Sequence, residues 1–371
     1  MASVAEVAVL VDAVRRLRSD VVSERGLINE LQQVLAAARS TPSAPISGAS
    51  EVVREAQQEQ SNSSDYFGLE TLLASVDSGA IAPLRGSWLV THHKAGGRLK
   101  RRQDLPIEAF WTARELRSCA QALGRNFGVL FVALSYRWLT KGHPDPDGFH
   151  LTIVAQVAAL YLNRSGKAEY PSQLTQAFEP LGTPDFALFW DFASLHQSPR
   201  LQGEEDLFRQ GLSLSNVWYG NAQTVVWLQS ELPAGFAGAD YDTSGWCFVE
   251  AAISAAIKPG FQRLDLAKRT TLTLEWAYGP EQPGNPDVKL ACVCARSRLP
   301  PPSPERVEEL LRTQKKFTNA SDVSTVAKLY ATFFASVVQV DALDFKGLAW
   351  GPDDAAQLCQ VLPRFHVTTL E

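Results

Sequence analysis

Three continuous apolar runs of strand length, separated by segments of helical periodicity, constrain this chain more than any other feature of its sequence. The runs are residues 128–135, 185–191 and 222–228, and the helical segments are 149–162, 204–218 and 246–257. Unbroken apolar strands are typical of parallel sheets that are covered on both faces. The alternation therefore predicts an α/β fold, a parallel sheet with helices on both faces. Residues 270–276 and 288–294 are candidates for later strands.

Composition shifts divide the rest of the chain. Ser, Pro, Gln and Gly are enriched from residue 40 to residue 64, which is typical of a linker, and three consecutive prolines break the chain at 300–302. The predicted organisation is an N-terminal helix (1–40), a linker (41–64), an accessory region (65–125), the α/β domain (126–300), a helical segment (301–340) and a distinct C-terminal segment (341–371).

The N-terminal segment carries a long apolar stripe. Between residues 4 and 39, Val, Leu and Ile recur at steps of three and four residues. Such a stripe must pack against something. Two interpretations stay open: a short coiled coil that joins copies of the chain into a homo-oligomer, and docking on the chain's own body.

Charge and composition exclude several classes of protein. The net charge is −5 and the pI is about 5.8, which argues against a nucleic-acid binder that works by phosphate neutralisation. No uncharged apolar run reaches the roughly 18 residues of a membrane span, and the first 20 residues do not resemble a secretory signal. The five cysteines lack paired metal spacing, which indicates reduced thiols and a cytoplasmic location.

Polar and aromatic side chains gather where the predicted strands end. Ser135, Tyr136, Arg137 and Trp138 follow the first strand, and Trp190 and Asp191 close the second. In open parallel sheets, ligands bind at the carboxyl ends of the strands. The sequence therefore predicts a ligand site at this edge.

Three segments in this region carry a family resemblance. Residues 132–138 (VALSYRW) resemble the opening "ALSYxWG" of fungal heterokaryon-incompatibility (HET) domains, and residues 189–197 (FWDFASLHQ) resemble their "WIDxxCINQ" segment. Residues 244–250 (SGWCFVE) resemble the HET "RGWxxxE" and the "SxWCxxE" of Toll/interleukin-receptor (TIR) domains. The resemblance covers roughly 126–260 and implies a flavodoxin-like sheet.

The resemblance also implies an activity. Active TIR domains cleave the nicotinamide–ribose bond of NAD, so NAD is the implied substrate and no bound cofactor is expected. Glu250 matches the acidic position of the family and is the candidate catalytic residue, because a carboxylate can stabilise an oxocarbenium-like transition state. Its position near the start of a helix predicts an ionised side chain at pH 7. A capping or surface role for Glu250 is the alternative.

The other candidate residues would bind substrate. Arg137 is suited to a pyrophosphate, and an ion pair with Asp191 is its alternative. Ser135 and Tyr136 can donate to phosphate or ribose, and the indoles of Trp138, Trp190 and Trp246 can stack on a base. No histidines share metal spacing, so no metal site is expected. Cys247 is interpreted as a buried thiol rather than a nucleophile.

Two further segments, one basic and one at the C-terminal end, also suggest roles. The basic stretch from His92 to Arg102 is either a solvated loop or an anion site. The C-terminal segment resembles the first unit of a ribonuclease-inhibitor-type leucine-rich repeat, with Leu343, Leu348 and Leu358 in apolar slots. About three such repeats are needed to bury their faces. A TIR-like module before leucine-rich repeats is a layout of intracellular immune receptors.

The resulting hypothesis is a cytoplasmic TIR-like or HET-like protein of signalling, immunity or cell death that hydrolyses NAD when it oligomerises. Two alternatives remain: a TIR-like module that only self-associates, and a leucine-rich-repeat scaffold with an inert N-terminal domain.

Overall fold

The computed structural model describes residues 66–163, 185–258, 260–271, 290, 293–340, 342–343, 345, 348, 350–366 and 369–370. The predicted N-terminal helix and linker lie outside the described residues. The described part falls into two compact units. The larger unit holds the described residues up to Arg298 together with Pro304–Val337, and the smaller unit holds Leu299–Ser303 together with those from Val338 onward.

A five-stranded mixed sheet forms the centre of the larger unit. Its strands, in chain order, are β1 (Leu84–Arg85), β2 (Phe131–Tyr136), β3 (Ala187–Phe189), β4 (Val225–Gln229) and β5 (Arg263–Asp265). Their order in the sheet is β1-β3-β2-β4-β5. The pairs β3–β2, β2–β4 and β4–β5 are parallel, whereas β1 runs antiparallel to β3. The α/β prediction is confirmed, and the expectation of an entirely parallel sheet is wrong at this edge.

The central strand β2 distributes its side chains between two faces. Val132, Leu134 and Tyr136 belong to an apolar cluster with residues of the helix after β2, as the twofold alternation of a strand requires. On the other face, Phe131 packs against the Trp218 ring at 5.6 Å between centroids. Both faces of β2 are therefore covered, which explains why its sequence shows no polar alternation.

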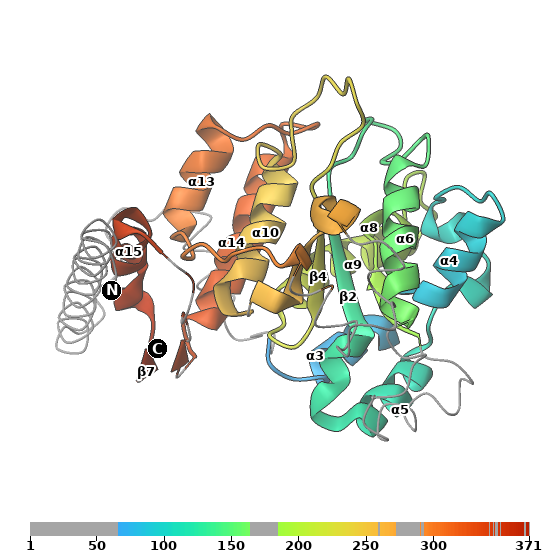
Figure 1. Ribbon diagram of the computed structural model, residues 1–371, viewed down its shortest axis with the longest axis horizontal. Helices are drawn as coiled ribbons and strands as arrows, with labels where there is room; N and C mark the ends of the chain where they lie inside the picture. The colour runs from blue at the N-terminus through green and yellow to red at the C-terminus, as the bar shows by residue number, and fades with distance from the viewer. Residues whose placement is uncertain are drawn as a thin grey trace, which may run out of the picture. The chain divides into compact units, whose positions relative to one another are not determined.

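Helices cover the two sides of the sheet (Figure 1). The helices are α3 (Glu70–Asp77), α4 (Gly86–Lys94), α5 (Ala113–Leu123), α6 (Phe149–Asn163), α8 (Asp191–Ser194), α9 (Glu204–Gly220), α10 (Gly245–Ile257), α13 (Pro304–Thr313) and α14 (Asp322–Val337). Helices α4 and α6 pack together on one side, and α9, α10 and α14 pack together on the other. Both 66–125 and 304–337, for which the sequence predicts separate segments, belong to this unit.

Short 3₁₀ helices connect these elements, and one of them includes the first two residues of a predicted strand. They are η2 (Arg102–Asp104), η3 (Ile107–Ala109), η4 (Gly124–Leu130), η6 (Gly260–Gln262) and η7 (Leu266–Thr271). The fourth parallel strand is β5, and Thr270 and Thr271 end η7 rather than beginning a strand. Most of the two predicted later strands lies outside the described residues.

Two buried arginines hold the C-terminal half of α10. The Arg263 guanidinium donates to the Ala251 carbonyl at 3.2 Å. Arg298 donates to the carbonyls of Ala255 and Ala256, at 2.9 Å each. Cations satisfy the unpaired carbonyls at a helix C-terminus and complement its dipole. The helix that carries Glu250 is thus fixed at the end remote from the sheet's carboxyl edge.

The smaller unit contains a strand, a helix and a second strand. They are β6 (Ala342–Leu343), α15 (Pro352–Val361) with the 3₁₀ helix η8 (Leu362–Arg364), and β7 (Thr369–Leu370), and β6 pairs in parallel with β7. Helix α15 buries Ala355, Leu358 and Val361. The resemblance of this segment to a leucine-rich repeat stays a prediction.

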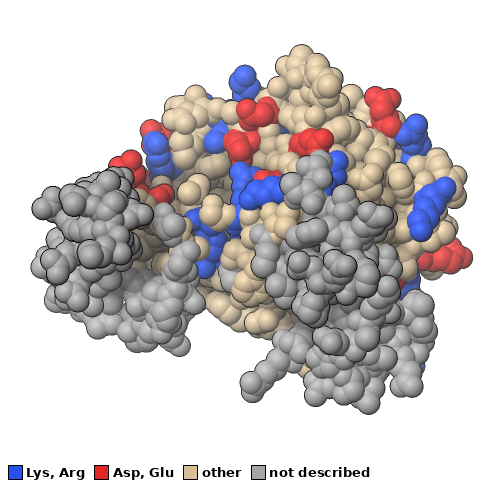
Figure 2. Space-filling model, viewed as in Figure 1, with Lys and Arg blue, Asp and Glu red and all other residues tan. Residues whose placement is uncertain are grey.

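Acidic and basic side chains lie side by side over the described part of the face in Figure 2, without a broad field of one sign. The expectation that no nucleic acid binds stays a prediction. Among the described residues, no helix combines the length and the apolar character needed to cross a bilayer.

Candidate functional site

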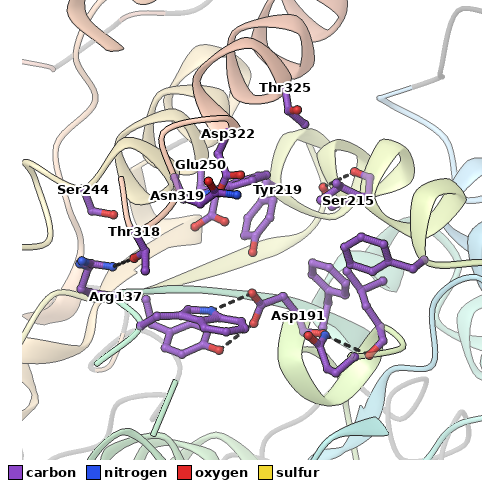
Figure 3. Close-up of a pocket in the computed structure, with 18 of the residues that line it drawn as sticks. Arg137, Asp191, Ser215, Tyr219, Ser244, Glu250, Thr318, Asn319, Asp322 and Thr325 are labelled. Atoms are coloured by element: carbon purple, nitrogen blue, oxygen red, sulfur yellow. Dashed lines mark hydrogen bonds between the residues drawn. The ribbon is translucent and has the colours of Figure 1, made fainter. Parts of the chain in front are cut away.

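A cavity of about 440 Å³ opens at the carboxyl ends of β2 and β3. This size is within the usual range for small-molecule sites. Five segments of the larger unit line it: the end of β2 with the loop after it, the end of β3 with α8 and the loop that follows, helix α9, the start of α10, and the connection from α13 into α14. The residues that carry its charge are Arg137, Lys141, Asp191, Arg200, Glu250 and Asp322. Figure 3 shows Glu250 between Arg137 on one side and Asp191 on the other.

Glu250 enters the cavity from α10. It is the sixth residue of a helix that begins at Gly245, so it lies beyond the first turn, where the helix dipole acts most strongly. The residue keeps some contact with solvent, but its carboxyl group lies among protein atoms, and this burial raises its pKa to about 8. A hydrogen bond that Ser135 donates at 2.5 Å offsets part of the increase.

This environment corrects one prediction. The helix-dipole argument predicts an ionised Glu250 at pH 7, whereas a pKa of about 8 leaves most molecules protonated there. The physical reason is that removal of a carboxylate from water outweighs a dipole that has decayed by the second turn.

Asp191 forms the opposite wall, where β3 passes into α8. Its carboxylate accepts hydrogen bonds from the Tyr136 hydroxyl at 2.7 Å, the Trp138 indole nitrogen at 3.1 Å and the Phe192 backbone nitrogen at 2.6 Å. Burial raises the pKa of Asp191, and these hydrogen bonds act against that increase. The carboxylate therefore fixes the orientation of an indole and a phenol at the end of β2.

Arg137 does not form the alternative ion pair with Asp191. Its guanidinium donates to the Thr318 hydroxyl at 3.3 Å and to the Ala239 carbonyl at 3.4 Å. No carboxylate of the described residues lies within ion-pair distance of Arg137. Together with Lys141, it presents positive charge that an anionic ligand can use.

The connection between α13 and α14 supplies a wall that the sequence motifs did not indicate. Thr318 and Asn319 of the connection, and Asp322 and Thr325 of α14, line the cavity from this side. The segment is joined to the start of α10 by two backbone hydrogen bonds, from Lys316 to the Thr243 carbonyl at 2.8 Å and from Gly245 to the Lys316 carbonyl at 3.0 Å. The Trp246 indole nitrogen donates to Asp322 at 2.9 Å.

The structure brings six of the eight predicted site residues to the cavity wall. They are Tyr136, Arg137, Trp138, Asp191, Trp246 and Glu250. Ser135 is fully buried behind Glu250, where its hydroxyl is turned to protein groups rather than to a ligand. Trp190 is also fully buried; it belongs to the apolar cluster on the α6 side of the sheet and does not line the cavity.

The structure also bears on three other features that the sequence analysis considered: the Cys247 thiol, the basic stretch from His92 to Arg102, and a metal site. Cys247 is buried, and burial raises the pKa of its thiol, which disfavours the nucleophilic thiolate. In the basic stretch, Arg102 donates to the carbonyls of Gly79, Ala80 and Ser194, and Arg101 pairs with Asp104. Among the residues that the structure describes, no three His, Cys, Asp or Glu side chains are grouped as metal ligands.

Fold and site together define an α/β protein with a polar, aromatic-lined pocket at the carboxyl ends of its parallel strands. The chain matches no family model, no curated protein and no solved structure with which it was compared.

Proposed function

We propose that this chain is a cytoplasmic TIR-like or HET-like signalling protein whose pocket binds NAD and cleaves the nicotinamide–ribose bond when copies cluster. One observation carries the proposal: Glu250, Arg137 and the Trp138 ring, from motifs more than 100 residues apart, line the same cavity.

The strand order supports the fold part of this proposal. Numbered along the chain, the four parallel strands β2, β3, β4 and β5 lie in the order 2-1-3-4. Flavodoxin-type sheets have the order 2-1-3-4-5, and their ligands bind outside the carboxyl ends near the first strand. The antiparallel β1 is an addition at the edge next to β3.

The chemistry of the walls suits a dinucleotide. Arg137 and Lys141 can bind a pyrophosphate, and the rings of Trp138 and Trp246 can stack on a base. The ionised Glu250 carboxylate can stabilise the positive charge that develops on the ribose as nicotinamide leaves. Because the pKa of Glu250 is raised to about 8, the active ionised form becomes more populated from pH 6 to pH 9.

The assay measures nicotinamide release from NAD by the purified 371-residue chain, alone and fused to an oligomerising domain. Clustering is included because tethering raises the effective concentration of copies, the role proposed for the N-terminal segment. We expect release by the clustered wild type and none by the Glu250→Ala variant. Equal inertness of both proteins under clustering contradicts catalysis.

A second candidate function is a TIR-like module that self-associates without catalysis. The observation that favours it is the protonated state of Glu250 at neutral pH, which removes the negative charge that the reaction requires. Sedimentation of the 371-residue chain distinguishes this function if assembly persists in a protein that releases no nicotinamide. A leucine-rich scaffold is the remaining alternative, and it requires further repeats beyond the single β6–α15–β7 unit.

A further inference from the structure

Behind the cavity, two buried hydroxyl groups form a chain of hydrogen bonds with Glu250. The Ser135 Oγ lies 2.5 Å from Glu250 Oε2 and 2.6 Å from the Tyr241 hydroxyl. Ser135 is fully buried and Tyr241 is 2% exposed. The three residues come from β2, from the β4–α10 connection and from α10 itself. None of the sequence motifs indicates Tyr241.

We infer that Ser135 and Tyr241 are positioning residues, which hold the Glu250 carboxyl at the cavity wall and set how readily it gives up its proton. The consequence for catalysis rests on the proposed function, but the effect on the proton of Glu250 does not. This role replaces the predicted contact of Ser135 with phosphate or ribose, because its hydroxyl is inaccessible to a ligand.

The chain of hydroxyls can satisfy both protonation states of the carboxyl. When Glu250 is ionised, Ser135 donates its only proton to the carboxylate, and Tyr241 donates to the Ser135 oxygen. When Glu250 is protonated, it can donate to Ser135, which then donates to the Tyr241 oxygen. The Ser135 hydroxyl both donates and accepts in either state, so proton loss from Glu250 needs only a rotation of hydroxyl hydrogens along this chain.

No charged neighbour of Glu250 among the described residues stabilises its ionised form by an ion pair, so the hydrogen bonds from hydroxyl groups are decisive. Among the described residues, no cation lies within ion-pair distance of Glu250. Asp191 faces it from α8 and disfavours its negative charge. The groups that face the site from the other elements are Arg137 and Lys141 after β2, Arg200 after α8, Tyr219 on α9, Cys247 on α10 and Asp322 on α14. The hydrogen bond from Ser135 is thus the largest contribution that favours the ionised form.

The test is a direct titration of Glu250 in the 371-residue chain, with glutamate labelled at the carboxyl carbon and followed by NMR. The Glu250→Gln variant identifies the signal. We expect a wild-type midpoint near 8 and a midpoint about one unit higher in Ser135→Ala, since a hydrogen bond to a charged group is lost. Ser135→Thr keeps a hydroxyl and restores the wild-type midpoint. Tyr241→Phe gives a smaller increase.

Ser254→Ala is the matched control. Ser254 is a buried serine on α10, the helix that carries Glu250. Its hydroxyl contacts Arg263 and the Ala251 carbonyl instead of Glu250. Its loss can lower stability without moving the Glu250 midpoint. An unchanged midpoint in Ser135→Ala, or an equal shift in Ser254→Ala, overturns the inference. If the midpoint moves as expected in a protein that releases no nicotinamide, the inference stands and the proposed catalysis falls.

Discussion

The Trp246 indole nitrogen donates a hydrogen bond of 2.9 Å to the Asp322 carboxylate, and this bond joins two helix starts that are 76 residues apart in the sequence. Asp322 begins α14, and Trp246 is the second residue of α10. The bond connects a side chain within the family-like motif to a helix outside it, so α14 is part of the site.

This relationship predicts a specific loss of stability. Asp322→Ala removes the acceptor of the indole and a favourable charge at a helix start, and should lower the free energy of unfolding by about 1–2 kcal/mol in urea titrations. Asp322→Asn keeps an acceptor oxygen and should cost about 0.5 kcal/mol. Asp206→Ala is the control, since Asp206 lies exposed in the first turn of α9. Equal losses for Asp322→Ala and Asp206→Ala contradict a role for the indole bond.

Asp191 should be more important for stability than its exposure suggests. Asp191→Ala leaves the Tyr136 hydroxyl, the Trp138 indole and the Phe192 amide without their acceptor, and we expect a loss of about 3 kcal/mol. Asp191→Asn keeps one acceptor oxygen in nearly the same shape and should lose roughly half as much. Urea unfolding of the two variants measures the difference, and indistinguishable values would show that the carboxylate is not the organising group.

Arg137 should bind the anionic part of the ligand. Arg137→Ala removes a guanidinium that has no carboxylate partner among the described residues, and should weaken NAD binding roughly 10- to 100-fold in calorimetric titrations. The control, Arg114→Ala, makes the same change of charge at an exposed position on α5 that does not line the cavity. Equal effects of the two variants would indicate a general charge effect rather than a binding site.

The protonated state of Glu250 predicts how stability depends on pH. Its folded-state pKa of about 8 lies above its ordinary value of 4.5, so the folded protein holds the proton more tightly than the unfolded chain does. This contribution is therefore fully present below about pH 4.5 and is lost as the pH rises through 8. Allowing for the partial exposure of the residue, the loss is of the order of 1–3 kcal/mol.

Glu250→Gln resembles the neutral acid and should lack this decline. The stability of the variant relative to wild type should therefore increase from pH 5 to pH 8 in urea titrations. Asp191, whose pKa is also raised, contributes to the decline in both proteins. A difference that stays constant over this range would mean that Glu250 is ionised in the folded state.

The central strands and helices could be predicted because a strand buried on both faces is a continuous apolar run and a packed helix shows apolar periodicity. The apolar run 128–135 contains most of β2, and the predicted helix 204–218 coincides with α9 to within two residues. Strand β5 was missed because three residues that include Arg263 and Asp265 make no apolar run. Strand β1, of two residues, offers even less signal.

The sequence predicts the residues of the candidate site only where they lie at strand ends or in the motif at the start of α10. Tyr219 lines the cavity, and the Tyr241 hydroxyl reaches Glu250 through Ser135 behind it. No spacing rule indicates such single hydroxyl groups. Asp322 lies within the predicted helical segment 301–340, but its contact with Trp246 depends on how α14 packs. The protonation of Glu250 depends on burial, which a motif does not encode.

The most direct measurement is the rate of nicotinamide release from NAD by the clustered protein between pH 6 and pH 9. If Glu250 acts as an ionised carboxylate in this pocket, the wild-type rate should increase with pH, and the midpoint of this increase should lie near pH 8. Glu250→Gln should release no nicotinamide at any pH. Release by Glu250→Gln at the wild-type rate, or no release by clustered wild type across the whole range, contradicts the account.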